Sequence, residues 1–180
     1  MTQKEILSDG IVTLRAVELS DVDTLYRWEN DTTQWVTNNA FAPYSRKQLW
    51  DYANNYDGDI FKSRNIRFMI ATDDNESAGT VDLYDFDPVN NRAFAGIYIS
   101  KNERGHGYAT RAMNILLDYA KTCIGMKQIA AITDAANNES INMLEKCGFS
   151  CCGSLKSWFR QGSQYRDALL FQHITSHANH

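Results

Sequence analysis

The chain has 180 residues, a net charge of −4, 43% hydrophobic residues and 22% charged residues. These values are ordinary for one globular domain, and a chain of this length buries a sizeable core without disulfides or metals. The acidic balance excludes proteins that track nucleic-acid phosphates, because those need a basic surface.

The sequence also shows no sign of membrane insertion or secretion. No apolar run approaches the roughly 20 residues of a membrane span, and the opening MTQKEILSDG has no apolar signal-peptide core. The cysteines and histidines show no metal-ligand spacing, so we expect reduced thiols and no metal. We therefore expect a cytoplasmic protein that binds neither membrane nor nucleic acid. One domain should cover residues 1–174, with a loose polar tail over 175–180.

Hydrophobic periodicity predicts a mixed α/β domain. A first helix is expected to begin near Asp21, and the capping box Ser45 to Gln48 begins a second. Amphipathic spacing predicts a third helix over 107–122 and a fourth over 137–146. Alternating residues and turn residues predict strands over 11–15, 66–72, 78–86, 93–100, 128–133, 149–159 and 165–171.

The stretch ERGHGYATRA joins the predicted strand 93–100 to the third helix and carries two glycines. Glycine weakens both strands and helices, so two of them at this joint indicate a requirement of the backbone. A helix N-terminus has unpaired N–H groups and a partial positive charge, and glycines let an anion approach them. Arg104 can add charge-assisted hydrogen bonds to phosphate. We therefore predict a phosphate or pyrophosphate site here.

Two familiar phosphate-binding patterns do not fit this joint. The Walker pattern G-x-x-x-x-G-K-[ST] is absent from the sequence. A dinucleotide-binding pattern needs a third glycine and a place early in a βαβ unit. Here Thr110 takes the third position, and the joint follows an antiparallel meander of predicted strands.

Two segments instead resemble the GNAT N-acetyltransferase superfamily. The spacing Arg104-x-x-Gly107-x-Ala109 is similar to the segment after the fourth strand of that superfamily. Residues 137–149, NNESINMLEKCGF, are similar to its N-x-x-S-I-x-x-x-E-K-x-G-F segment, in the branch that acetylates ribosomal-protein N-termini and polyamines. The run SLKSWFRQGSQYRDALLF looks particularly like the spermidine N-acetyltransferase end of that branch.

The resemblance covers nearly the whole chain and implies a fold. That fold is a twisted, mostly antiparallel sheet of about seven strands with about four flanking helices. A cofactor cleft is expected where the fourth strand, ending at Ser100, diverges from the fifth, starting near Lys127. Dimers or larger rings are common in this branch, so a homo-oligomer is expected.

The resemblance also implies acetyl-CoA as cofactor and assigns residues to it. The strand residues Ile97, Tyr98 and Ile99 would follow the pantetheine arm. Asn137 and Ser140 would reach the pantetheine or the thiol, and Lys146 the far end of the cofactor. The pyrophosphate would be held by Arg104 and by the amides of Gly105, His106, Gly107, Tyr108, Ala109 and Thr110.

The sequence departs from the family at both usual acid–base positions. Relatives often carry a tyrosine where this chain has Leu144, and a glutamate where it has Phe94. Neither role can be carried over, so Ser140 is the candidate hydrogen-bond donor to the departing sulfur, with helix capping as its alternative role. Candidates for the acceptor pocket are Glu29, Asp31, Trp35, Phe41, Tyr44 and Asp82.

Two classes of function therefore compete. The first is direct acetyl transfer from acetyl-CoA to a primary amine. A small polyamine-like acceptor leads, followed by a protein N-terminus and then by an antibiotic or amino sugar. The second is a non-catalytic acyl-CoA sensor, which Phe94 and Leu144 favour.

Overall fold

A computed structural model describes residues 6–33, 42–73 and 76–175. Within these ranges, seven strands form one sheet in the order β1-β2-β3-β4-β5-β7-β6. All neighbouring strands are antiparallel except β4 and β5, which are parallel. The strands are β1 (Val12–Arg15), β2 (Ile66–Thr72), β3 (Ser77–Asp87), β4 (Arg92–Ile99), β5 (Gln128–Asp134), β6 (Ser150–Gln161) and β7 (Gln164–Ile174). The predicted mixed α/β fold is confirmed.

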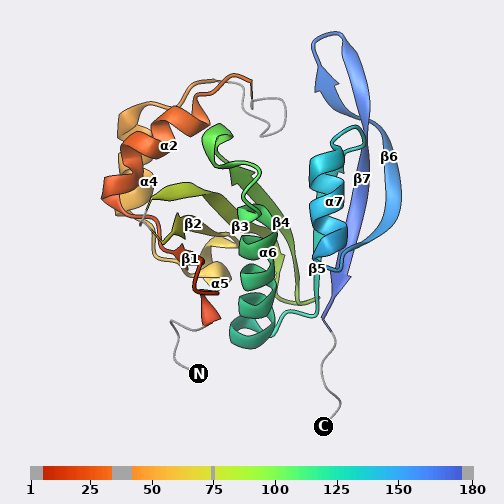
Figure 1. Ribbon diagram of the computed structural model, residues 1–180, viewed down its shortest axis with the longest axis horizontal. Coiled ribbons are helices and arrows are strands. Elements are labelled where there is room, and N and C mark those ends of the chain that lie inside the picture. The colour runs from red at the N-terminus through yellow and green to blue at the C-terminus, as the bar shows by residue number, and fades with distance from the viewer. Residues whose placement is uncertain (1–5, 34–41, 74–75, 176–180) are drawn as a thin grey trace.

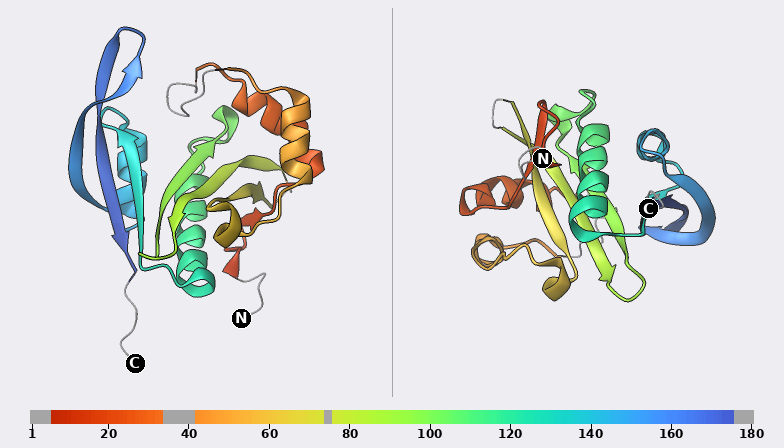
Figure 2. Two further views of the ribbon diagram at one scale, coloured as in Figure 1. Left: turned by 180° about the vertical axis from the view of Figure 1, so that it is seen from behind. Right: turned by 90° about the horizontal axis from the view of Figure 1, so that it is seen from below.

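The helices cover the sheet on both faces (Figures 1 and 2). The helix α6 (Tyr108–Tyr119) packs on β1, β3 and β4, and α7 (Asn138–Lys146) lies beside it. On the opposite face lie α2 (Val22–Glu29) and α4 (Arg46–Asn54). Each face has its own core. The smaller, under α2 and α4, is made of Val17, Val22, Leu25, Leu49, Ala53 and Met69.

The parallel pair β4 and β5 is short. It consists of Arg92 with Gln128, Ala93 with Ile129, and Phe94 with Ala130. β5 pairs with β7 along its whole length instead, from Gln128 to Asp134. The ribbons of β4 and β5 therefore separate beyond Phe94, as the resemblance implied (Figure 1).

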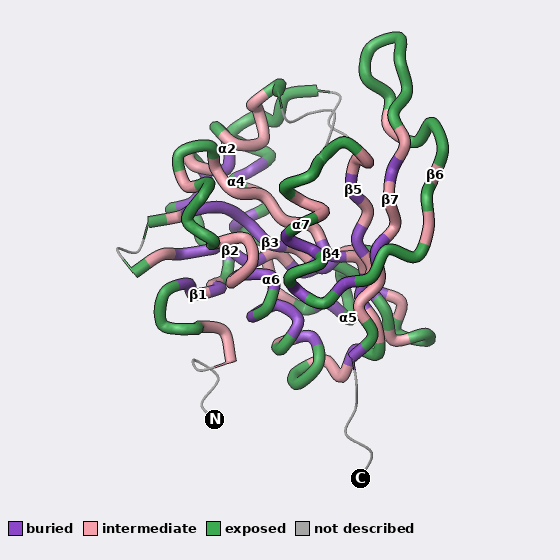
Figure 3. The backbone as a smooth tube through the Cα atoms, turned by 45° about the vertical axis from the view of Figure 1, so that its right-hand side comes forward, coloured by how far each residue is buried: buried purple, intermediate pink, exposed green. Residues whose placement is uncertain are grey.

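The hairpin of β6 and β7, here called the arm, extends beyond the rest of the sheet (Figures 1 and 3). Most of β6 is exposed. A bulge between Leu155 and Phe159 interrupts the β6–β7 register and puts Ser157 in the left-handed region at φ 51°. The Asp167 carboxylate accepts a hydrogen bond from the Ser157 amide (2.9 Å) and forms an ion pair with Lys156. These two contacts stabilise the bulge.

Three local features differ from the sequence-based expectations. The short helix α5 (Ile60–Ser63) was not predicted; Asp59 caps it by accepting the amides of Phe61 and Lys62. The helix α6 continues into a π-helical turn over Ala120–Ile124 before Gly125 ends it at φ 74°. Thr175, expected in the tail, is buried, and its hydroxyl donates to the Met126 carbonyl.

Asp21 connects the first strand to the first helix through charge-assisted hydrogen bonds. Nη1 and Nη2 of Arg15 each donate to the Asp21 carboxylate at 2.8 Å, and the Glu18 amide donates to it at 2.9 Å. Burial opposes the charge of Asp21, but these hydrogen bonds outweigh it and hold the pKa of Asp21 below its ordinary value of 3.8.

Asp21→Asn should lower the free energy of unfolding at pH 7 by about 1–2 kcal/mol, because it removes a charge-assisted pair. The folded-state pKa is depressed, so this contribution is complete above about pH 4 and is lost as the pH falls below it. Thermal unfolding measured from pH 7 down to pH 3 should show the melting temperatures of the wild type and of Asp21→Asn converging. An equal difference at both ends would contradict this role of Asp21.

Candidate functional site

A cleft of about 850 Å³ opens where β4 and β5 separate. It is continuous through the sheet, because its lining includes residues from both faces. Its α6/α7 half is lined by residues including Ile97, Met113, Thr133, Asn137, Ser140 and Leu144. Its α2/α4 half is lined by residues including Trp28, Glu29, Tyr44, Arg67, Asp82, Tyr84 and Tyr98.

The strand register explains this division. Residues that pair across antiparallel strands share a face, and alternate residues of one strand do too. Asp82 pairs with Gly96, and Tyr84 pairs with Phe94, so all four lie on the α2/α4 face. Ile97 alternates with them and packs against the core under α6.

The helix α7 supplies the wall of the α6/α7 half. Asn137 is its N-cap, and the Asn137 side chain accepts the Ser140 amide at 3.1 Å. Asn137, Ser140 and Leu144 recur at helical spacing and therefore form one stripe toward the cleft. Leu144 is buried, so this stripe presents amide and hydroxyl groups at its start and a hydrocarbon surface farther along.

The glycine joint has the geometry of an anion site. Gly105 and Gly107 adopt φ of 84° and 80°, a region that favours glycine, and Gly107 is the N-cap of α6. A Cβ at either position would meet nothing within 4 Å, so the space beside this backbone is open. The start of α6 therefore has the open backbone that the predicted anion site would need.

Side chains around this joint hold its shape. Arg104 is exposed, and its Nε donates to the Ile99 carbonyl at 3.2 Å. The His106 ring stacks on Tyr108 with ring centroids 5.4 Å apart, and its Nδ1 lies 3.3 Å from the Glu103 carbonyl oxygen.

In the α2/α4 half, Arg67 joins two carboxylates from different elements. Its Nε and Nη2 donate to both oxygens of Asp82 at 2.7 and 3.0 Å, and its Nη1 donates to Glu29 at 2.8 Å. Although burial opposes the charge, Asp82 and Glu29 keep the pKa of Arg67 above its ordinary value. The three groups together carry a net charge of −1 and are fixed in position.

Aromatic rings also line this half. The Tyr84 ring stacks on Phe94 with centroids 5.6 Å apart, and it leans over Gly96, where a Cβ would lie 3.5 Å from it. The rings of Trp28 and Tyr98 pack against each other with their centroids 5.4 Å apart. Burial, with Asp85 and Asp82 nearby, raises the pKa of Tyr84, so its hydroxyl stays protonated.

The structure brings together seven of the residues singled out from sequence: Glu29, Tyr44, Asp82, Ile97, Tyr98, Asn137 and Ser140 line the cleft. Asp31 lies elsewhere, in an ion pair with Lys101 at 3.1 Å. Lys146 is exposed in the last turn of α7. Trp35 and Phe41 lie outside the described residues.

Sequence reasoning missed many residues of the cleft, and four polar residues are among them: Arg67, Tyr84, Asp134 and Arg166. A signal existed for two of them. The hairpin of β2 and β3 sets Arg67 opposite Asp82. Asp134 comes directly after the strand predicted over 128–133 and is the last residue of β5 in the structure, at an end of the strand where polar groups gather. No sequence signal marked Arg166, because its partner Asp134 is distant in the chain.

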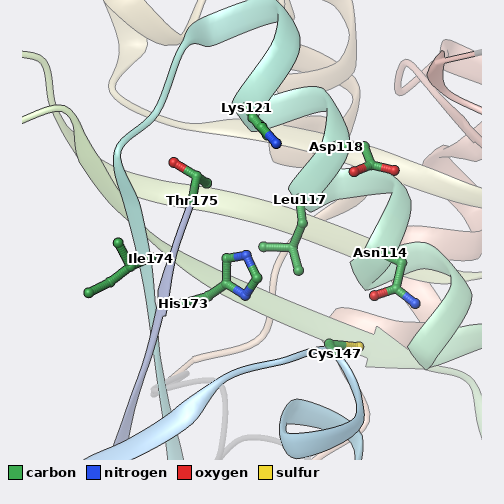
Figure 4. A pocket seen from close by; sticks show the side chains of 8 residues that line it. All are labelled: Asn114, Leu117, Asp118, Lys121, Cys147, His173, Ile174 and Thr175. Atoms are coloured by element: carbon green, nitrogen blue, oxygen red, sulfur yellow. The ribbon is translucent and has the colours of Figure 1, made fainter. Parts of the chain in front are cut away.

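A second, smaller cavity of about 290 Å³ lies between α6 and the end of β7 (Figure 4). Cys147 and His173 contribute to its lining, with Asn114, Asp118 and Lys121 along the α6 side. Burial raises the pKa of the Cys147 thiol to about 11, so it is a protonated thiol and a poor nucleophile.

Comparison with known proteins identifies the family to which this site belongs. The model of the acetyltransferase (GNAT) domain matches residues 12–150. The chain belongs to the GNAT acetyltransferase family. It is therefore an N-acetyltransferase, and GNAT enzymes use acetyl-CoA as acetyl donor.

Several relatives within this family are spermidine N-acetyltransferases. The spermidine N(1)-acetyltransferase of Escherichia coli K12 is 32% identical over 168 residues, which cover 90% of this chain and 87% of the relative. Spermidine N-acetyltransferase from Vibrio cholerae in complex with CoA and spermine has a TM-score of 0.83 at 23% identity, covering 92% of this chain and 96% of the other. A dodecameric structure of spermidine N-acetyltransferase from V. cholerae has a TM-score of 0.75 at 24% identity, covering 92% and 95%. The two structures establish the shared fold.

Tyr56 anchors the strand that carries Arg67. β1 ends at Arg15, opposite Met69, so within the described residues β1 provides no partner for the Arg67 main chain. The Tyr56 hydroxyl takes that place, accepting the Arg67 amide at 2.9 Å and donating to the Arg67 carbonyl at 2.5 Å.

Tyr56→Phe should lower the free energy of unfolding by about 1–3 kcal/mol, because it leaves two main-chain groups without a partner. Chemical denaturation would measure this change. Tyr165→Phe, on the exposed arm, is the control and should change stability by less than about 0.5 kcal/mol. A Tyr56→Phe variant as stable as the control would show that water replaces the hydroxyl.

Proposed function

We propose that the protein transfers the acetyl group of acetyl-CoA directly to a primary amine of a linear polyamine. The observation that carries this proposal is the cleft that passes through the sheet. Its half beside α6 and α7 is lined by apolar side chains with Asn137 and Ser140, and its half beside α2 and α4 is acidic and aromatic. The names of the E. coli and V. cholerae relatives support the choice of a polyamine.

The α6/α7 half fits the donor. The amides of Gly105 to Thr110 and the Arg104 guanidinium would hold the pyrophosphate. Main-chain groups of Ile97 to Ile99 would hydrogen-bond the pantetheine arm, since within the described residues β5 no longer pairs with this part of β4. Asn137 and Ser140 would contact its thiol end. The bound donor supplies an activated acetyl thioester next to the opening.

The α2/α4 half fits the acceptor. Arg67 orients the carboxylates of Glu29 and Asp82, and the net charge of −1 favours an ammonium. The aromatic walls from Trp28 and Tyr98 add cation–π attraction for the same charge. Of the other acceptor candidates from sequence, Tyr44 lies at the exposed rim.

Transfer then occurs at the opening between the halves. A neutral amine attacks the thioester carbonyl, the C–N bond forms, the C–S bond breaks, and the sulfur leaves as thiolate. Main-chain N–H groups of β4 would stabilise the oxyanion, and the Ser140 hydroxyl would donate a hydrogen bond to the sulfur. The surplus amine proton passes to water, because Phe94 and Leu144 provide no base or acid.

We also propose that the protein assembles as a homo-oligomer. The exposed β6 edge and the exposed aromatic residues Trp158 and Tyr165 of the arm support this. The dodecameric relative from V. cholerae gives further support.

Arg104→Ala and Gly107→Glu should each weaken acetyl-CoA binding by at least tenfold. The first removes charge-assisted bonds to phosphate, and the second adds a negative charge and an unfavourable φ at the helix start. Titration calorimetry would measure both, with Lys121→Ala, at the far end of α6, as the control. Unchanged affinity in both variants would contradict the anion site.

A panel of acceptors tests the proposed function. Purified protein with acetyl-CoA should acetylate spermidine and spermine with kcat/KM at least tenfold above that for a peptide with a free N-terminal amine. Mass spectrometry of the product and release of free thiol report the reaction. Turnover on the peptide alone would reverse the acceptor assignment, and donor binding without turnover on any amine would instead support a sensor.

A further inference from the structure

Carboxylates held by arginines lie on both walls of the α2/α4 half. Asp82 lies on β3, opposite Gly96 of β4. Asp134 ends β5, on the same face as Ala130, which pairs with Phe94. Because Phe94 and Gly96 share the face of Asp82, the register sets Asp82 and Asp134 on one face and on opposite sides of the opening.

Asp134 is fixed from the arm. Arg166 of β7 donates to its Oδ2 at 2.7 Å, and the Ala136 amide donates to its Oδ1 at 2.8 Å. The Asp134 side chain is 13% exposed and the Arg166 side chain 42% exposed, and both line the cleft. A carboxylate accepts about four hydrogen bonds. Asp134 therefore retains acceptor capacity toward the cleft.

The charges of this half divide between its two walls. The wall of β2 and β3 carries Glu29, Arg67 and Asp82, with a net charge of −1. The opposite wall carries Asp134 and Arg166 as a neutral pair, with Phe159 beside them. One ammonium contacts one wall, whereas a linear molecule with two amino groups reaches both.

We propose that Asp134, positioned by Arg166, binds the second ammonium of the acceptor, so that the enzyme selects linear diamines and polyamines over monoamines. This inference rests on the proposed function and adds a specificity residue to it. Arg166 fixes the carboxylate and also offsets its charge. Removing the carboxylate and removing the guanidinium should therefore change selectivity differently.

The test compares kcat/KM for 1,4-diaminobutane, spermidine and butylamine in the full-length protein. Asp134→Asn keeps an acceptor for the Ala136 amide but loses the charge. It should reduce the ratio of diamine to butylamine by about tenfold, the value of one charge-assisted hydrogen bond. Asp134→Ser repeats the test with another neutral side chain. Arg166→Gln retains the carboxylate and should not lower the ratio.

The control is Asp23→Asn, since Asp23 is also paired with an arginine, Arg46, but does not line the cleft. Its ratio should equal that of the wild type. A wild type that prefers the diamine, with an unchanged ratio in both Asp134 variants, would overturn this inference alone. Equal losses on diamine and butylamine in the Asp134 and Arg166 variants would reduce the pair to a structural role. A wild type that acetylates no diamine or polyamine would overturn the proposed function as well.

Discussion

The early end of the β4–β5 pairing is the constraint on which the rest of the structure depends. Parallel pairing is slightly less stable per residue than antiparallel pairing, and here it covers three residue pairs, whereas β5 makes seven with β7. β5 thus follows the arm rather than β4. The consequence is an opening through the sheet, beside the part of β4 that no longer pairs with β5. Within the described residues this opening is also the meeting point of the two halves of the large cleft.

The chemistry at this opening follows from what surrounds it. Glu29, Asp82 and Asp134 are each held by an arginine, which fits their proposed role as electrostatic contacts for a cation better than a role as bases. The Tyr84 ring stacks on Phe94, and burial raises the pKa of the Tyr84 hydroxyl, so this group stays protonated. A site of this kind gains rate from holding donor and acceptor together and from polarising the carbonyl. The departures from the family at Phe94 and Leu144 fit such a site.

Much of this fold was predictable from local sequence. Alternation and turn residues located every strand within about two to three residues, because most strands have a buried face and β6 is bounded by Gly148 and by the turn around Gly162. The Ser45 to Gln48 capping box and the glycines after α6 and α7 marked helix ends correctly. The backbone of the glycine joint was also predictable, since it depends on two glycines and one helix start within a single segment.

Contacts between distant segments were not predictable in this way. Arg67 and Glu29 are 38 residues apart in the sequence. Their pairing depends on α2 packing on the same face of the sheet as the Arg67 side chain of β2. Asp134 and Arg166 meet because β7 inserts between β5 and β6, an order that no local pattern specifies. The burial of Thr175 was not predictable either. It depends on contacts with the Met126 and Lys127 carbonyls just before β5, whereas the neighbours of Thr175 in the sequence are polar.

The most direct test of this account is a crystal structure with CoA and spermidine bound together. The account predicts the pyrophosphate at Gly105 to Thr110, the thiol entering the opening from the α6/α7 face, and the polyamine on the α2/α4 face with a primary amine at the opening. A polyamine on the same face as CoA, or bound away from the opening, would contradict it.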